Sequence, residues 1–236
     1  LYYKYKVNNM LIKGFNKLTL LDYPGYIACV IFTLGCNWKC PFCQNSALVI
    51  KPSKKDLISE DEIINYMIER KGKIDGICIS GGEPTIQPDL KPFIKRIKDL
   101  GFLVKLDTNG TNPDVLSDLL KDNLLDYIAM DIKNIKDKYE STVDTHINYD
   151  NILKSINIIK NSNIDHEFRT TVVNEYHTKD DLVNIAKLVS PSNYYLQQFK
   201  DSGDLIGDGL TSHTSSFVLD ACEACNEYTK TETRGI

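Results

Sequence analysis

Three cysteines lie close together in the string GCNWKCPFCQN, with the spacing C-x3-C-x2-C: Cys36, Cys40 and Cys43. Three thiolates on one short loop can wrap a single inorganic centre. Gly35 precedes the loop and Pro41 lies inside it, and both residue types favour an irregular, non-helical backbone path. The spacing therefore indicates a metal or iron–sulfur centre held by a loop.

An iron–sulfur cluster is the centre that this loop favours. A structural zinc ion usually takes four Cys or His ligands, but the first histidine is His146, and Cys29 sits within a β-branched run. A cluster with only three protein ligands leaves one iron open, and an open metal position is where chemistry takes place. Zinc and an incidental grouping of thiols are the alternatives.

The other four cysteines have simpler interpretations. Cys29 in YIACVIF and Cys78 in GICIS lie in strand-like apolar runs, so we expect them to pack in the core. Cys222 and Cys225 form a C-x2-C pair in DACEACNE, which cannot complete a metal site alone. We expect incidental or structural thiols there, with redox or metal binding shared with a partner chain as the alternative.

The composition argues against some classes of protein. The 28 basic and 32 acidic residues give a net charge of −4, which is no electrostatic footprint for general nucleic-acid binding. Apolar runs are far shorter than the roughly 18 residues of a membrane helix, and the string LYYKYKVNN lacks a signal-peptide core. We therefore expect a cytoplasmic protein with reduced thiols and with neither membrane nor nucleic acid as a partner. Met10 begins the string MLIKGF, and we assign residues 1–9 no function.

The elements that must position these residues alternate along the chain. Apolar runs predict strands, and amphipathic runs with caps predict the helices between them. The predicted strands are 27–34, 76–80, 102–106, 127–130, 167–173 and 194–199, and the predicted helices are 59–71, 89–100, one beginning at Asn112–Pro113, 151–160 and 179–189. Such alternation implies parallel strands with right-handed crossovers. These units are too few for a closed eight-stranded barrel, so the predicted fold class is α/β, a partial (β/α)6 TIM-like barrel.

Flanking segments complete the predicted chain. A strand and a turn are expected over 11–24, and a helix near 215–226 and a short strand near 228–233 are expected at the end. We divide the chain into an N-terminal extension with that first strand and turn, residues 1–25, and a barrel domain, residues 26–236.

Polar residues gather just past the end of each predicted strand. After the cysteine loop come SGGEP (80–84), LDTNG (106–110), MDIK (130–133), FRTT (168–171) and LQQF (196–199). In a β/α barrel these strand ends meet on one face, where active sites are built. Taken singly, each has a structural alternative: a tight turn, an Asx turn, a salt bridge between Asp131 and Lys133, an ion pair of Arg169, or a polar core position for Gln198.

The cysteine spacing with Phe42 before the last cysteine, followed by GGEP, resembles the radical S-adenosylmethionine (SAM) superfamily. Over about residues 11–235, the strings LDYPG, LDTNG and MDIK make the chain resemble more narrowly the activating proteins of anaerobic ribonucleoside-triphosphate reductase, within the glycyl-radical-enzyme activases. The resemblance implies a radical SAM partial barrel and an enzyme that cleaves SAM reductively and generates a glycyl radical on the reductase.

The resemblance also implies roles for individual residues. Cys36, Cys40 and Cys43 would bind a [4Fe–4S] cluster whose open iron chelates the methionine part of SAM. An electron from the cluster would then give methionine and a 5′-deoxyadenosyl radical. Around SAM, Phe42 would pack near the adenine, the backbone at Gln44 would lie alongside, and the amino group would be cradled by Gly81, Gly82 and Glu83.

Further cofactor-binding residues are expected on the later strands: Asp107, Thr108, Asp131, Lys133, Arg169 and Gln198. Two carboxylates beside the carboxylate of SAM would repel one another. We therefore hypothesise that a small cation or Lys133 bridges Asp107 and Asp131. Arg169 would hold the ribose or carboxylate of SAM, or the glycine loop of the partner.

The expected partners are the large anaerobic ribonucleotide reductase, or another glycyl radical enzyme, and a flavodoxin or ferredoxin reductant. Many activases have histidine where this chain has Gln44, which puts a proton-transfer role there in doubt. The chain also lacks an inserted block of cysteines for auxiliary clusters. Alternatives are another radical SAM enzyme, such as a different activase or a peptide or nucleoside modifier, and a non-catalytic zinc or iron–sulfur electron-transfer module.

Overall fold

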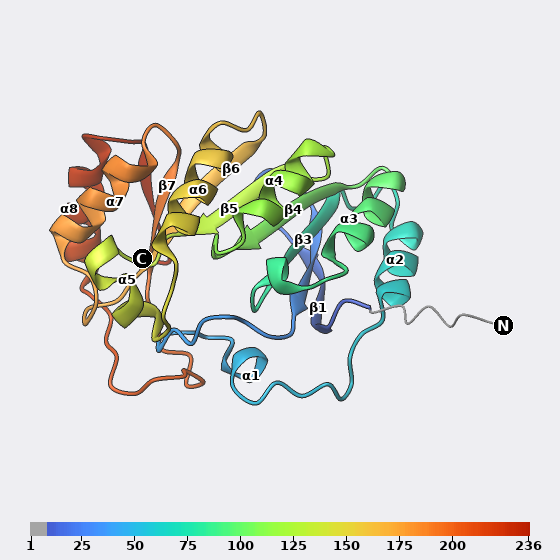
Figure 1. Cartoon of the computed structure of the whole chain (residues 1–236), viewed down its shortest axis with the longest axis horizontal. Coiled ribbons are helices and arrows are strands. Elements are labelled where there is room, and N and C mark those ends of the chain that lie inside the picture. Colours follow the sequence, from blue (N-terminus) through green and yellow to red (C-terminus); the bar gives the residue numbers. More distant parts are fainter. Residues whose placement is uncertain (1–8) are drawn as a thin grey trace.

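The structure is a computed structural model that describes residues 9–236 (Figure 1); residues 1–8, to which we assigned no function, lie outside the described residues. Within that part, a single sheet has its strands side by side in chain order. The strands are β1 (Ile12–Thr19), β2 (Ala28–Thr33), β3 (Gly76–Gly81), β4 (Leu103–Thr108), β5 (Tyr127–Asp131), β6 (Asp165–Val172), β7 (Tyr194–Gln198) and β8 (Thr231–Arg234). β1 is antiparallel to β2, and every later neighbour is parallel.

Helices connect the parallel strands and lie alongside the sheet (Figure 1). They are α1 (Ser46–Val49), α2 (Glu60–Glu69), the short 3-10 helix η1 (Pro84–Ile86), α3 (Leu90–Asp99), α4 (Pro113–Lys121), α5 (Lys136–Val143), α6 (Tyr149–Lys160), α7 (Lys179–Val189) and α8 (Ser215–Asn226). The predicted α/β partial barrel is confirmed. β8 adds another parallel strand at the edge, and α1 and α5 were not predicted because neither has a long amphipathic repeat.

Alternation along the strands separates an apolar outer face from a polar inner face. On β4, Val104 and Leu106 are buried in the core, whereas Lys105 and Asp107 line cavities inside the sheet. The helices cover the outer face with apolar side chains, as Ile152, Ile156 and Ile159 of α6 do, each at most 1% exposed. The helix predicted over 151–160 is therefore present, and the inner face is left to charged groups.

The turn between β1 and β2 tucks an aromatic ring under the sheet. The Tyr26 amide donates to the Tyr23 carbonyl at 3.1 Å, and Gly25 has a φ of +81°, so a turn is present at the end of the segment 11–24, where one was expected. The Tyr23 ring is 1% exposed and packs edge-on against Tyr127 of β5, with 6.0 Å between ring centroids. This packing holds the turn against the inner face of the sheet.

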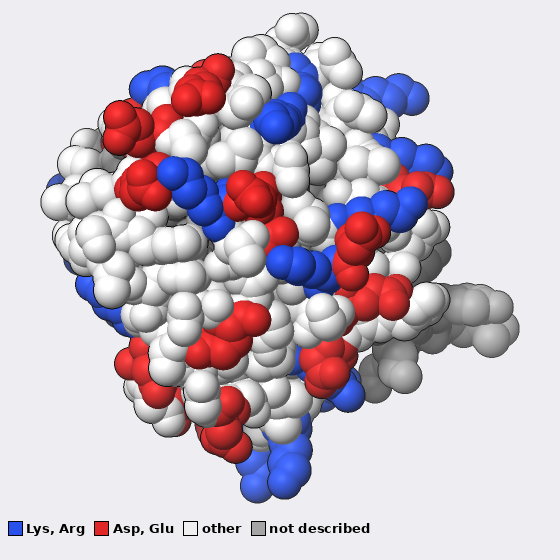
Figure 2. All heavy atoms as spheres, turned by 90° about the vertical axis from the view of Figure 1, so that its left-hand side faces the viewer, with Lys and Arg blue, Asp and Glu red and all other residues white. Residues whose placement is uncertain are grey.

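The face formed by α5, α7 and α8 carries both signs of charge, interspersed over the surface (Figure 2). Ion pairs link these helices: Lys138 contacts Asp181 at 2.6 Å, and Lys179 contacts Asp220 at 2.8 Å. Between residues 9 and 236, the helices are all too short or too polar to cross a lipid bilayer.

Candidate active site

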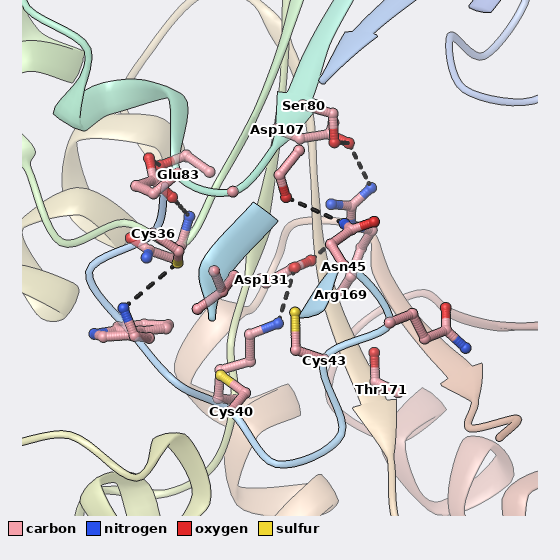
Figure 3. Close-up of a pocket in the computed structure, with 18 of the residues that line it drawn as sticks. Cys36, Cys40, Cys43, Asn45, Ser80, Glu83, Asp107, Asp131, Arg169 and Thr171 are labelled. Carbon is pink, nitrogen blue, oxygen red and sulfur yellow. Dashed lines mark hydrogen bonds and ion pairs between the residues drawn. The ribbon is translucent and has the colours of Figure 1, made fainter. Parts of the chain in front are cut away.

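A cavity of about 370 Å³ lies where the parallel strands end, and loops from β2, β3, β4, β5 and β6 surround it (Figure 3). This volume falls in the roughly 300–1,000 Å³ range of small-molecule sites. Most of the predicted site residues line it: Cys36, Cys40, Phe42, Cys43, Gln44, Gly81, Gly82, Glu83, Asp107, Thr108, Asp131, Lys133 and Arg169. The convergence of strand ends that the sequence predicted therefore brings these residues together.

Gln198 is the predicted site residue that does not line this cavity; its neighbour Gln197 does. Successive side chains of a strand point to opposite faces, so Gln197 faces inward and Gln198 faces the helices. The side-chain amide of Gln198 donates to the carbonyl of His213 at 2.6 Å.

The cysteine loop is anchored against α5. Trp38 is 2% exposed and packs edge-on against Tyr139 of α5, with 5.6 Å between centroids, and the Lys39 amide donates to the Val143 carbonyl. Burial raises the pKa of the Cys36 thiol to about 11 and that of the Cys40 thiol to about 12. These thiols need a positive centre beside them in order to ionise at neutral pH.

The donor set fits an iron–sulfur cluster. Among residues 9–236, no three His, Cys, Asp or Glu side chains gather closely enough to hold one metal ion. A [4Fe–4S] cluster takes each thiolate on a different iron, so its ligands surround the cluster rather than meet at a point. Cys36, Cys40 and Cys43 line one cavity from one loop (Figure 3), which suits this arrangement.

The glycine pair after β3 brings two backbones into contact. The Gly82 amide donates to the Thr33 carbonyl at 2.9 Å, and the Glu83 amide donates to the Gly35 carbonyl at 2.9 Å. A Cβ on Gly82 would lie 1.9 Å from the Gly35 oxygen, and Gly81 has a φ of +112°. Only glycines permit this approach, so the pair sets the β3 loop directly against the start of the cysteine loop.

The Glu83 carboxylate is occupied by its own chain. It is 1% exposed and accepts from the backbone amides of Thr85 and Asn109, at 3.0 and 2.7 Å, and from the Thr108 hydroxyl at 2.7 Å. Burial raises the pKa of this carboxyl, while the hydrogen bonds oppose the rise. Glu83 therefore joins the β3 and β4 loops, and these contacts use the oxygens that we expected an ammonium ligand to use.

Arg169 lies between the two carboxylates of the site. Its Nε is 2.8 Å from Asp131 Oδ1, and its Nη1 is 3.4 Å from Asp107 Oδ2 (Figure 3). The bridge that we assigned to a small cation or to Lys133 is thus made by Arg169, because β6 lies beside β5 with Asp131 and Arg169 in register. Of these two carboxylates, Lys133 Nζ contacts that of Asp131, at 3.0 Å, and it also lies over the Phe42 ring, 5.7 Å from the centroid.

These cations keep the carboxylates charged. Burial alone would raise the pKa of the Asp131 carboxyl, but the charges of Arg169 and Lys133 hold it well below its usual range. The pKa of Asp107 is lowered in the same way, by Arg169 and Lys105.

Three charged residues of the inner face were not predicted: Lys105, Glu167 and Arg234. Lys105 is 2% exposed and pairs with Asp107, and its Nζ also lies 3.7 Å from the Cys78 thiol. The sequence did contain a signal for two of these residues. Lys105 and Glu167 each lie two positions before a predicted site residue on the same strand, and so on the same face. Cys78 and Cys29 are buried in strands, as expected.

Residues 30–189 match the sequence profile of the Radical SAM superfamily. The chain belongs to the radical SAM superfamily. Over 203 residues it is 39% identical to a glycyl-radical enzyme activating enzyme of Methanocaldococcus jannaschii, a match that covers 82% of each protein. It is 32% identical over 100 residues to a pyruvate formate-lyase-activating enzyme of Staphylococcus aureus, covering 39% of each. This radical SAM protein therefore falls in the glycyl-radical-enzyme activase group.

Solved structures with low sequence identity share the fold of this radical SAM protein. A radical SAM methyltransferase from Sphaerobacter thermophilus has a TM-score of 0.70 at 12% identity, covering 92% of this chain and 69% of that one. A domain of a pyruvate-formate lyase-activating enzyme from Bacteroides vulgatus has a TM-score of 0.57 at 16% identity, covering 68% and 99%. Membership of the superfamily implies a [4Fe–4S] cluster and SAM as cofactors, and the activase group implies a glycyl radical enzyme as the partner.

Proposed function

We propose that this protein generates the glycyl radical of a large anaerobic ribonucleotide reductase. The observation that carries the proposal is the shared cavity: three thiols of one loop, the glycine backbone of the β3 loop and the Arg169 network surround a single space. The choice of the reductase rests on the strings LDYPG, LDTNG and MDIK.

Within this proposal, Cys36, Cys40 and Cys43 hold the cluster. The chemistry that a bound [4Fe–4S] cluster supplies is a low-potential electron for reductive cleavage of the sulfonium bond of SAM. The chain itself binds and orients SAM. Gly81 and Gly82 line the cavity, and in this proposal their backbone lies beside the methionine amino group.

The charged residues supply the remaining contacts of SAM in this proposal. Lys133 uses part of its donor capacity on Asp131 and retains N–H groups for a ligand carboxylate. Phe42, 4% exposed beside the Tyr176 ring, offers an apolar surface for the adenine. A flavodoxin or ferredoxin is the proposed electron donor.

Pyruvate formate-lyase is the second candidate partner, because the chain is 32% identical over 100 residues to an enzyme that activates it. The test is anaerobic loading of the full chain with iron and sulfide, followed by incubation with SAM, a reductant and either purified partner. We expect 5′-deoxyadenosine and a glycyl radical signal in electron paramagnetic resonance with the reductase. The matched controls are Cys36→Ser, which should lose both signals, and Cys222→Ser, which should keep them.

A glycyl radical on pyruvate formate-lyase alone would replace the reductase as the partner. If the fully loaded wild-type protein forms no 5′-deoxyadenosine, the enzymatic function is refuted and an electron-transfer module remains as the alternative.

A further inference from the structure

Charged pairs continue from the cavity down the inner face of the sheet. Below Arg169, the Glu167 carboxylate is 1% exposed and lies 3.9 Å from Arg169 Nη1. Two nitrogens of Arg234 donate to its two oxygens at 2.7 and 2.8 Å, and the Tyr127 hydroxyl donates at 2.8 Å. From the last strand to the cavity wall, the charges in this row alternate in sign, in the order Arg234, Glu167, Arg169 and Asp131.

Arg234 is held firmly in this row. Its guanidinium stacks on the Tyr195 ring, 3.6 Å from the centroid, and β8 fixes its backbone against Gln197 of β7. The paired contacts to Glu167 need the planar fork of a guanidinium, which lysine cannot supply. The edge strand β8 therefore carries, on the inner face of the sheet, an arginine whose guanidinium is held by Glu167 and Tyr195.

The position of Arg169 depends on competition among three carboxylates. Asp131 and Asp107 attract its guanidinium toward the cavity, and Glu167 attracts it from below. Because Arg234 occupies both oxygens of Glu167, Glu167 competes weakly. Without Arg234, the buried Glu167 carboxylate would keep the Tyr127 hydroxyl but lose its paired cation, and it would draw Arg169 away from Asp107 and Asp131.

We propose that Arg234 and Glu167 are positioning residues for the SAM cavity, which hold Arg169 between Asp107 and Asp131. This inference rests on the proposed function, in which that cavity binds SAM. It gives the C-terminal strand β8 a part in cofactor binding without any contact to the cofactor.

The first test reads the position of Arg169 in the metal-free full chain. The chain has four arginines, so a ¹⁵N NMR spectrum of the arginine Nε–Hε groups is simple, and Arg169→Lys assigns the Arg169 signal. We expect Arg234→Gln to shift this signal and to speed its hydrogen exchange, because the bond to Asp131 loosens. Arg234→Lys should give a smaller change. Lys230→Gln, which removes a charge near the same chain end, should leave the signal unchanged.

The second test measures SAM affinity of the anaerobically loaded protein in a double-mutant cycle. We expect Arg234→Gln to weaken SAM binding about 10-fold, the effect of roughly one lost charge-assisted contact. In the Arg169→Lys background the same change should cost less than about 2-fold, since residues that act through one another are non-additive.

The outcomes separate the two proposals. A loaded wild-type protein that does not bind SAM would remove the proposed function and this inference with it. If the wild type binds SAM, an unshifted Arg169 signal or an additive loss in the double mutant would overturn the inference alone. Should Arg234→Gln not fold, Arg234→Lys carries the same comparison.

Discussion

The carboxylate of Glu83 accepts a hydrogen bond from the backbone amide of Asn109 at 2.7 Å, and this bond joins loops that leave two neighbouring strands. Its other oxygen accepts from the Thr85 amide at 3.0 Å. Each oxygen thus faces a backbone N–H in a site that is 1% exposed. Water cannot replace a lost partner there, so the junction of the two loops depends on a side chain that has two acceptor oxygens and no N–H group.

Glu83→Gln should destabilise the metal-free protein. In either orientation, the side-chain NH₂ of glutamine would face one backbone N–H, and a buried donor left unpaired costs about 1–3 kcal/mol. Urea unfolding at pH 7 measures the change. The exposed Glu69→Gln is the matched control and should cost less than about 0.5 kcal/mol. Equal stability of the two variants would contradict the proposed coupling of the loops.

Gly82→Ala should disrupt the junction between the β3 loop and the cysteine loop. The new Cβ would lie 1.9 Å from the Gly35 oxygen. Neither the Cβ nor this backbone oxygen can rotate away, so the loops must separate. We expect a loss of about 3 kcal/mol or more in urea unfolding, at or above the upper end of the usual cost of overpacking, together with weaker iron incorporation.

Gly203→Ala is the control for a glycine-to-alanine change that introduces backbone strain without a clash, whereas Gly82 has the clash and no positive φ. Gly203 has a φ of +82° but open space around its Cβ position, so its replacement by alanine should cost only about 1–2 kcal/mol. A Gly82→Ala variant as stable as Gly203→Ala would show that the loops do not need this close approach.

Much of this architecture is predictable because it depends on local sequence. The strand and helix periods identify β2 to β7, and the parallel order places their ends on one face. The cysteine loop, the glycine pair and the residues Asp107, Asp131 and Arg169 follow from that placement. The contact of Asp131 with Lys133 also follows, because the two residues lie two positions apart.

Other contacts depend on register across the sheet, which local sequence does not specify. Arg169 reaches Asp131 because these two residues are paired across β5 and β6, a relationship between segments 38 residues apart. A one-residue uncertainty in a short strand reverses the face of every side chain. This is why the prediction chose Gln198, whereas its neighbour Gln197 lines the cavity.

The C-terminal cysteine pair should be dispensable for the iron centre. Cys225 is fully buried on α8, the Cys222 thiol lies 3.3 Å from the Thr231 carbonyl, and neither lines the cavity. Replacing both with alanine should leave iron content and SAM cleavage unchanged and should cost about 1–2 kcal/mol of stability from the lost packing of Cys225. Iron analysis of the loaded variant tests this, and a loss of more than a quarter of the iron would assign the pair to the centre.

The pairing of Glu167 with Arg234 predicts a pH-dependent stability. Burial alone would raise the pKa of Glu167, but the hydrogen bonds from Arg234 and the charge of Arg169 lower it below its usual value. A carboxyl with a lowered folded pKa contributes stability that is present above its unfolded pKa of about 4.3 and is lost as the pH falls through the folded value. Arg234→Gln should remove this contribution.

We expect Arg234→Gln to lose about 1–3 kcal/mol at pH 7, less than the 3–5 kcal/mol typical of a broken buried pair. The reduction follows from the 35% exposure of the Arg234 side chain, because solvent screens its charge. As the pH falls below about 4.3 and then through the lowered pKa of Glu167 in the wild type, this carboxyl becomes protonated in both proteins, so their urea midpoints should converge. Lys230→Gln should show no such convergence. A deficit of Arg234→Gln that stays constant from pH 7 down to the pH at which the wild type itself unfolds in acid would instead assign the loss to the stacking of Arg234 on Tyr195, since packing does not titrate.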